Sequence, residues 1–327
     1  MPGTINWGLL STARINRSLI AGVRASKRSH LTAIASRELP KGREFAQNWD
    51  ILTAYGSYED LLADPNIDVI YNPLPNHLHA LWTIKALEAG KHVLVEKPIA
   101  LSVSEVRAIR QAALKNGKIV AEAFMYRHHP QTLKVQELVA AGEIGEIHFI
   151  EGTFSFNLQR PTDIRWNPEY GGGSIWDIGC YPLSYTRMIV GCNPIAVQGF
   201  QVQTPSAVDL TFSGQLQYSD GILAQFHSSF GLPYQTRMVI QGTTGTIEVS
   251  SPFKPEDPRV PLVLRLEDGQ KEFLFPGCEL YLGEVEDMEN AVLNGQPARM
   301  TMQESEDIIA TIVALLESAK TGQPISL

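Results

Sequence analysis

The stretch WGLLSTARIN, residues 7–16, has the pattern of a buried strand that ends in a tight turn and leads into a helix. Dinucleotide-binding domains carry G-x-G-x-x-G here, because glycine permits the turn and lets the backbone approach a pyrophosphate closely. The three glycine positions hold Ser11, Ala13 and Asn16. Ser11 and Ala13 are small enough to preserve part of that role, but the stretch alone fits an ordinary strand–helix connection equally well.

The first third of the chain repeats this alternation of strand and helix. Short apolar runs between helical patterns are typical of βαβ units around a parallel sheet covered on both faces. The predicted strands are residues 5–10, 31–35, 68–72, 92–96 and 118–123. The predicted helices are residues 15–25, 40–48, 77–89, 102–115 and, after the last strand, 130–141. We therefore predict a doubly wound, Rossmann-type α/β domain over residues 1–124.

The pattern changes after about residue 145 to alternating or β-rich segments that are separated by turn signals. The predicted strands here are residues 146–156, 207–218, 222–230, 237–242 and 245–250. The predicted helices are residues 174–190, 281–294 and 302–320. We expect residues 125–327 to form an α+β domain with an open-faced, mainly antiparallel sheet.

The composition limits the classes of function. With 44% apolar and 19% charged residues, the 327-residue chain has the balance of a soluble globular protein with two cores. The net charge of −8 argues against a nucleic-acid surface, and no apolar run approaches a membrane span of ~20 residues. The three cysteines show no C-x-x-C spacing, and the adjacent histidines of YRHHP do not converge on one metal, so we expect no metal. No secretory signal is visible, so we expect a cytoplasmic protein.

Polar residues after the first two strands predict the cofactor. Backbone N–H groups of residues 12–15 would face an anion from a helix N-terminus, and Arg14 adds a cation. Ser36 and Arg37 follow the second strand, where an NAD-preferring domain usually places an acid, and a guanidinium there suits the 2′-phosphate of NADP. We predict NADP(H), preferred over NAD(H). The residues that we expect to contact it at these two places are Ser11, Thr12, Ala13, Arg14, Ile15, Ser36 and Arg37.

Two further strand ends carry polar residues. After the strand at 68–72 we expect Pro75, Asn76 and His79 to contact the cofactor, although Asn76 is equally reasonable as a helix N-cap. The run VEKPIA places Glu96 and Lys97 at the mouth of a buried strand, where charge is costly unless it is paired or used. A partly desolvated lysine beside a cationic nicotinamide would have a depressed pKa or polarise a substrate hydroxyl. The alternative is a surface lysine at a strand end.

The run GGGSIWDIGCYP, residues 171–182, contains the other candidates for chemistry. Asp177 and Tyr181 are four residues apart and would share one face of an α-helix. A lysine beside a tyrosine stabilises phenolate and brings its pKa of ~10 nearer neutrality, which suits proton transfer. Asp177 would bind a substrate hydroxyl. Taken alone, Tyr181 fits a packed aromatic at least as well.

Together the opening turn, SR at 36–37, EKP at 96–98 and GGGSxxDxGxY resemble the Gfo/Idh/MocA family of NAD(P)-dependent oxidoreductases across the whole chain. EAFMYRHHPQ and GGGSIWDIGCYP resemble its branch of D-xylose dehydrogenases, dimeric dihydrodiol dehydrogenases and glucose–fructose oxidoreductase. The resemblance implies that Lys97 lies near the nicotinamide and that Asp177 binds substrate. Many members have histidine where this chain has Tyr181, while the sugar-oxidising branch has tyrosine. It also implies a homodimer or homotetramer formed through the open sheet.

The expected reaction is hydride transfer to or from a carbinol carbon of a sugar or polyol, with Lys97, Tyr181 and Asp177 as catalytic residues. Weaker candidates for contacting the substrate are Tyr126, Arg127, Arg165 and Trp166. Two alternatives remain: a redox-neutral enzyme with tightly bound nicotinamide, and a non-catalytic NADP-binding regulator.

Overall fold

The computed structural model describes residues 3–257 and 259–327, which form two compact units. Unit 1 runs to Met125 and includes Glu279–Ser305; unit 2 consists of Tyr126–Cys278 and Glu306–Leu327. The chain therefore returns to unit 1 after completing most of unit 2, whereas we predicted a single boundary after residue 124.

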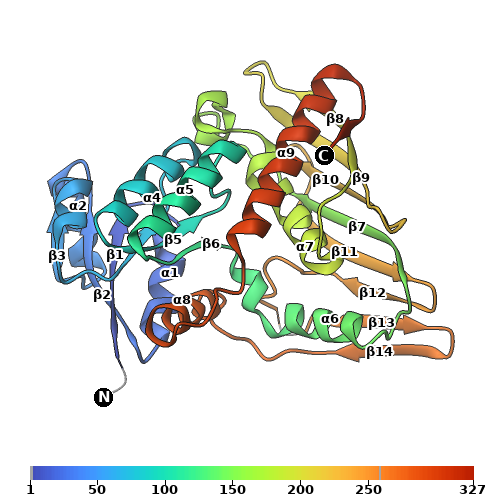
Figure 1. The fold of residues 1–327 in the computed structure, drawn as a ribbon, viewed down its shortest axis with the longest axis horizontal. Helices are drawn as coiled ribbons and strands as arrows, with labels where there is room; N and C mark the ends of the chain where they lie inside the picture. Colours follow the sequence, from blue (N-terminus) through green and yellow to red (C-terminus); the bar gives the residue numbers. More distant parts are fainter. Residues whose placement is uncertain (1–2, 258) are drawn as a thin grey trace. The chain divides into compact units, whose positions relative to one another are not determined.

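Unit 1 is built on a six-stranded sheet in the order β3-β2-β1-β4-β5-β6, and all its strands are parallel (Figure 1). This confirms the predicted Rossmann-type sheet. The strands are β1 (Ile5–Leu10), β2 (Ser29–Ala35), β3 (Thr53–Tyr55), β4 (Val69–Asn72), β5 (His92–Glu96) and β6 (Val120–Ala123). The strand order reverses between β1 and β4, and a ligand of such a sheet binds outside the carboxyl ends of the strands at this reversal.

Helices cover both faces of this sheet. They are α1 (Asn16–Ala25), α2 (Leu39–Asn48), α3 (Tyr58–Ala63), α4 (His79–Glu88), α5 (Val103–Asn116) and α8 (Leu282–Asn294), with a 3₁₀ turn η1 (Asn76–Leu78) before α4. Side chains of α1, α2 and α8 share one core with Trp7, Leu9 and Tyr71 of the sheet. Because Val285 and Met288 lie in that core, α8 belongs to unit 1.

Unit 2 is built on a nine-stranded sheet in the order β14-β13-β12-β11-β7-β10-β9-β8-β15 (Figure 1). Neighbouring strands are antiparallel except β7 and β10, so the sheet is mixed and mainly antiparallel, as we predicted. The strands are β7 (Ile147–Ser155), β8 (Ala196–Gln203), β9 (Asp209–Gln217), β10 (Leu223–Ser229), β11 (Gln235–Gly242), β12 (Gly245–Val249), β13 (Leu262–Leu266), β14 (Gly269–Phe273) and β15 (Ile325–Ser326).

Helices pack on one face of this second sheet. Phe212 and Phe226 are buried there, and Leu315 of α9 lies against the backbone of Gly214. On the opposite face β9 exposes every second residue: Ser213, Gln215 and Gln217. The helices and helical turns outside the first sheet are η2 (Met125–His128), α6 (Pro130–Ala140), η3 (Ile164–Trp166), η4 (Pro168–Tyr170), the π-helix η5 (Ile175–Gly179), α7 (Cys180–Val190) and α9 (Met302–Thr321).

Two kinds of feature are absent from the described residues, 3–257 and 259–327. None of their helices has the length and apolar character needed to cross a membrane. Within the same residues, no three His, Cys, Asp or Glu side chains are grouped so that they could hold a metal ion.

Candidate active site

The predicted cofactor residues of unit 1 lie at one edge of its sheet. Ser11 follows β1, Ser36 follows β2, Pro75 comes three residues after β4, and Lys97 follows β5. Because these strands are parallel, their carboxyl ends meet at the same edge, on both sides of the reversal in strand order. The structure therefore brings together four segments that are spread over almost ninety residues of sequence.

The turn after β1 fits a bound phosphate. Ser11 adopts the left-handed backbone that glycine favours, with φ of 65°, and its carbonyl oxygen accepts a hydrogen bond of 2.8 Å from Asn16 Nδ2. The N–H of Ala13 donates to Ser11 Oγ at 3.2 Å. Among the residues that the structure describes, the N–H groups of Thr12, Arg14 and Ile15 find no acceptor. These three N–H groups at the start of α1 are free to bind an anion. We predicted four such donors, and the fourth, the N–H of Ala13, donates to Ser11 Oγ instead.

The segment after β2 holds one buried and one exposed polar side chain. Ser36 is buried, and its Oγ accepts a hydrogen bond of 3.3 Å from the N–H of Glu38. Arg37 is exposed, and its guanidinium lies beside the Tyr58 hydroxyl. Burial raises the pKa of Tyr58, while the charge and hydrogen bond of Arg37 lower it in part. Arg37 is therefore held at the strand end by one neutral partner, which leaves its charge available to a phosphate.

His79 supports the strand ends instead of facing solvent. Its ring is 1% exposed and lies between two backbone carbonyl oxygens, with Nδ1 2.7 Å from Pro98 O and Nε2 2.6 Å from Leu74 O. Burial is the main cause that lowers the pKa of His79 to about 4, against the two hydrogen bonds, which raise it. Contact of His79 with the cofactor stays a prediction. Asn76 is the first residue of η1, and the residues that directly precede η1 and α4 are Pro75 and Leu78.

Glu96 and Lys97 are anchored by neighbouring strands. The Tyr71 hydroxyl of β4 donates to Glu96 Oε1 at 2.5 Å, and the N–H of Lys97 donates to Glu96 Oε2 at 3.3 Å. Beyond the cis Lys97–Pro98 bond, the N–H of Ile99 donates to Glu122 Oε1 of β6 at 2.9 Å. Lys97 itself is half-buried, and its charge helps lower the pKa of His79. The strand end thus holds the Lys97 backbone in place while its side chain keeps partial access to solvent.

In unit 2, Asp177 lies on a π-helix, which differs from the α-helix that we predicted over 174–190. The N–H of Asp177 donates to Gly173 O at 3.3 Å, and α7 begins only at Cys180. Pro182 has no N–H to donate to the carbonyl of Ile178, so the α-helical ladder cannot run unbroken through this turn. That Asp177 and Tyr181 act together on one face of this helical segment stays a prediction.

Asp177 forms an ion pair with Arg165, which was one of the weaker candidates for contacting the substrate. Arg165 Nε lies 2.5 Å from Asp177 Oδ2, and Arg165 Nη1 lies 3.2 Å from Asp163 Oδ1. Both carboxylates raise the pKa of Arg165, and Asp177 has the larger effect. Because a permanent cation stabilises its charge, Asp177 suits the binding of a hydroxyl better than the uptake of a proton. The next residue, Trp166, packs edge-on against Phe230 at 5.5 Å between ring centroids.

Tyr181 is packed among aromatic side chains, and its catalytic role stays a prediction. Its ring is 6% exposed and lies 5.3 Å from Phe154 and 5.4 Å from Phe253, between centroids. Tyr126 lies 6.0 Å from Tyr181 and is fully buried, so burial raises its pKa. Arg127 is also buried and donates to Ser184 O at 3.3 Å. The contact of Tyr126 and Arg127 with substrate stays a prediction.

We did not predict from the sequence that Asp209, the first residue of β9, lies at this site. Asp209 accepts hydrogen bonds from Ser174 and Ile175 at the start of the π-helix. The signal in the sequence was a carboxylate among apolar residues of a predicted strand, AVDLTF, since a buried acid is costly without partners.

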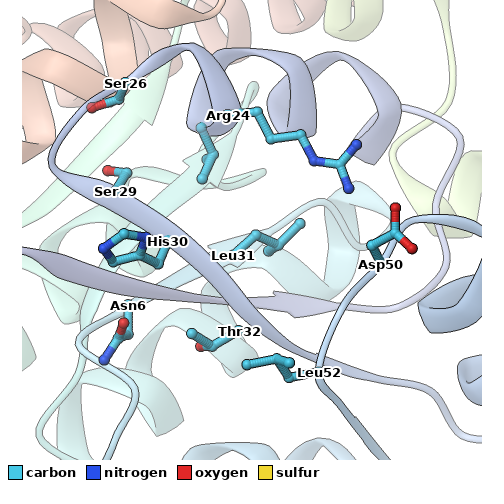
Figure 2. Close-up of a pocket in the computed structure, with 10 residues that line it drawn as sticks. Asn6, Arg24, Ser26, Ser29, His30, Leu31, Thr32, Asp50 and Leu52 are labelled. Carbon is cyan, nitrogen blue, oxygen red and sulfur yellow. The ribbon is translucent and has the colours of Figure 1, made fainter.

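A hollow of about 490 Å³ lies elsewhere on unit 1 (Figure 2). It is lined by Asn6 near the start of β1, by the first residues of β2, by the end of α1 and by Asp50 and Leu52. These are the amino ends of β1 and β2, so this hollow is separate from the edge that carries the phosphate turn.

Comparisons with known proteins agree with this arrangement. Residues 5–124 match the model of the oxidoreductase family with an NAD-binding Rossmann fold, and residues 132–248 match the GFO/IDH/MocA C-terminal domain. The chain belongs to the GFO/IDH/MocA family of oxidoreductases, which confirms the resemblance inferred from the motifs.

Individual relatives are similar over most of the chain. D-xylose 1-dehydrogenase (NADP(+)) 2 of Haloferax volcanii is 38% identical over 325 residues, covering 98% of this chain and 99% of the relative. Trans-1,2-dihydrobenzene-1,2-diol dehydrogenase of Xenopus tropicalis is 33% identical over 251 residues, 75% of each chain. The crystal structure of a 3-ketoreductase from Actinomadura kijaniata, in complex with NADP and TDP-benzene, superposes with a TM-score of 0.89 at 27% identity, over 97% of this chain and 98% of that one.

Proposed function

We propose that this oxidoreductase transfers a hydride between NADP(H) and a carbinol carbon of a sugar or related polyol. The observation that carries the proposal is the sheet edge of unit 1, where three free N–H donors, Arg37 and Lys97 follow parallel strands. The relative from Haloferax volcanii, named for D-xylose and NADP(+), supports both the cofactor and the substrate class. The cofactor supplies the hydride chemistry when bound, and the chain supplies orientation and proton transfer.

Each catalytic residue has one task in this proposal. During oxidation Tyr181 takes the proton of the substrate hydroxyl, and Lys97 stabilises the charge that develops and lowers the pKa of the phenol. Asp177, held as an anion by Arg165, binds a neighbouring hydroxyl and so selects the carbon that reacts. The remaining residues predicted at the site, Tyr126, Arg127 and Trp166 for the substrate and Pro75, Asn76, His79 and Glu96 for the cofactor, are proposed as contacts only.

Kinetics of two variants test these roles. We expect Lys97→Ala and Tyr181→Phe each to lower kcat by about 10²-fold or more, because a positioned proton donor or acceptor contributes that much. Turnover is followed at 340 nm across a panel of aldoses, ketoses and polyols. Tyr218→Phe is the matched control, since Tyr218 is a buried tyrosine at the end of β9. Near-wild-type turnover of both active-site variants would remove the assignment.

The same fold also supports a redox-neutral enzyme with tightly bound nicotinamide and a regulator that only binds NADP. Purified protein distinguishes these functions. Cofactor that stays bound through purification, with substrate conversion but no net change at 340 nm, would favour the redox-neutral enzyme. Binding of NADP with no conversion of any sugar would favour the regulator.

We further propose that the protein is cytoplasmic and forms a homodimer or homotetramer through the open face of the second sheet. Large apolar side chains on that face support the assembly: Phe200 and Val202 of β8 are 58% and 59% exposed, and Leu223 of β10 is 48% exposed. Exposed apolar side chains that gather on one face typically mark an interaction site.

A further inference from the structure

The glycines of the GGGS run make room for neighbouring groups, and one of these is a buried carboxylate. A Cβ on Gly173 would lie 2.1 Å from Asp209 Oδ1, and φ of Gly173 is +112°, a backbone that side chains rarely adopt. A Cβ on Gly172 would lie 2.5 Å from the carbonyl oxygen of Arg165. The run is therefore packed directly between the Arg165 segment and Asp209.

We propose that Asp209 is a positioning residue for the substrate site, because it fixes the start of the π-helix that carries Asp177 and leads to Tyr181. This inference rests on the proposed function for its catalytic meaning. Asp209 touches no residue to which we assign chemistry, and it acts through the backbone of residues 173–175.

The contacts of Asp209 are short and buried. Asp209 is 3% exposed, and its Oδ2 accepts hydrogen bonds from Ser174 Oγ at 2.6 Å and from the N–H of Ile175 at 2.8 Å. Ser174 is itself fully buried, and its Oγ also lies 2.9 Å from Ser228 Oγ of β10. Two strands of the sheet, β9 and β10, thus hold the residue that precedes the π-helix.

Gly173 connects Asp209 and its hydrogen bonds to Asp177. The carbonyl oxygen of Gly173, whose Cα faces Asp209, accepts the N–H of Asp177 at 3.3 Å. Pro182 leaves the carbonyl of Ile178 without its α-helical N–H donor, and β9 and β10 hold the turn at its other end. An anion at the start of a helix is also favoured by the helix dipole.

The charge of Asp209 agrees with this role. Burial raises the pKa of Asp209 to about 6, while the hydrogen bonds from Ser174 and Ile175 lower it and offset part of that rise. These two hydrogen bonds favour the ionised form of a carboxyl group that is nearly inaccessible to water. A buried carboxyl group is costly unless it is hydrogen-bonded, and a strongly perturbed pKa is common at functional sites.

Asp209→Asn tests the inference, with Asp307→Asn as the matched control. Asp307 is another buried aspartate of unit 2, and it accepts hydrogen bonds from Arg187 Nε at 2.8 Å and Asn193 Nδ2 at 2.9 Å. We expect Asp209→Asn to lower kcat by about 10- to 100-fold, because small misplacement of a substrate-orienting group costs this much, with the Kd for NADP unchanged. Asp307→Asn should lower the melting temperature while kcat is retained.

Two further measurements separate positioning from general stability. Hydrogen exchange of the peptide covering residues 174–181 should become faster in Asp209→Asn and stay unchanged in Asp307→Asn. In an Asp177→Asn background, Asp209→Asn should lower kcat/KM little further, because the effect of Asp209 acts through Asp177. Should Asp209→Asn fail to fold, Ser174→Ala removes one hydrogen bond of the same anchor, with the buried Ser318→Ala as its control.

Failure of this inference and failure of the proposed function give different results. Equal losses of kcat in Asp209→Asn and Asp307→Asn, or unchanged exchange of residues 174–181, would overturn the inference. If the wild-type protein converts no sugar, the proposed function fails, and the exchange experiment still decides whether Asp209 anchors the π-helix.

Discussion

Arg37 stands where an NAD-preferring domain places a carboxylate, and we propose that its charge determines which adenosine ribose the edge accepts. The guanidinium is exposed, and Tyr58 is a neutral partner that does not cancel its charge. A planar fork of donors matches a phosphate in two hydrogen bonds, whereas a ribose hydroxyl gains little from it.

We expect Arg37→Ala to raise the KM for NADP by about 10- to 100-fold, which corresponds to the loss of a hydrogen bond to a charged group of about 1.5–3 kcal/mol. The KM for NAD should change by less than about threefold, because NAD lacks the 2′-phosphate. Steady-state kinetics with both cofactors measure the difference. Arg43→Ala, a change of an exposed arginine on α2, is the control. Equal effects of Arg37→Ala on both cofactors would remove the phosphate argument.

Local sequence located the candidate groups of the site but not their partners. Ser11, Arg37, Lys97 and Asp177 stand beside strand ends or in a recognisable run, so position and residue type were sufficient to propose them. The ion pair of Arg165 with Asp177 depends on how a loop of 3₁₀ turns folds back over twelve residues. No periodicity encodes such a return, so the pairing could only be seen in three dimensions.

The helical pattern of α8 predicts that a helix forms but not where this helix packs. Its apolar stripe predicted a helix over 281–294 but not the sheet that it covers. The structure places α8 beside α1, where Gly22 meets the backbone that enters α8: a Cβ on Gly22 would lie 2.7 Å from the carbonyl carbon of Tyr281. Glu289 of α8 also accepts a hydrogen bond from the Ser29 hydroxyl of β2 at 2.6 Å. The return of the chain to unit 1 therefore depends on a glycine and a buried carboxylate that lie far apart in sequence.

We expect Gly22→Ala to lower the free energy of unfolding by about 1–2 kcal/mol. Alanine favours a helix interior by about 1 kcal/mol, but overpacking costs about 1–3 kcal/mol, and here the obstacle is backbone that cannot rotate away. Urea unfolding followed by tryptophan fluorescence measures the change, since Trp7 is buried in the core shared by α1 and α8. Gly277→Ala is the control, because a Cβ there meets no atom within 4 Å. A gain in stability for Gly22→Ala would contradict the close approach.

We did not predict strands β3, β8, β13, β14 and β15, and three of them carry no pattern in the sequence. β3 has three residues and β15 has two, too few for alternation to be visible. β14 reads GQKEF and is mostly exposed, so it carries no apolar pattern. These strands form because a neighbouring strand offers an open edge for hydrogen bonds, as β13 does for β14.

The open face of the second sheet carries the exposed apolar side chains that we propose as the oligomer interface. Phe200 and Val202 lie two residues apart on β8 and point to the same side, the side on which β9 exposes Ser213 and Gln215. A rotationally symmetric dimer through this face would bring the same patch of each copy against the other, so one change acts twice.

We expect the double variant Phe200→Glu/Val202→Glu to dissociate the proposed oligomer, because like charges from both copies would meet in a desolvated interface. Light scattering after size-exclusion chromatography should report the mass of one 36.1 kDa chain for this variant, and a multiple of it for the wild type. Leu114→Glu, on a 77% exposed residue of α5 in unit 1, should leave the mass unchanged. An unchanged mass of the double variant would exclude this face as the interface, and a monomeric wild type would exclude the assembly itself.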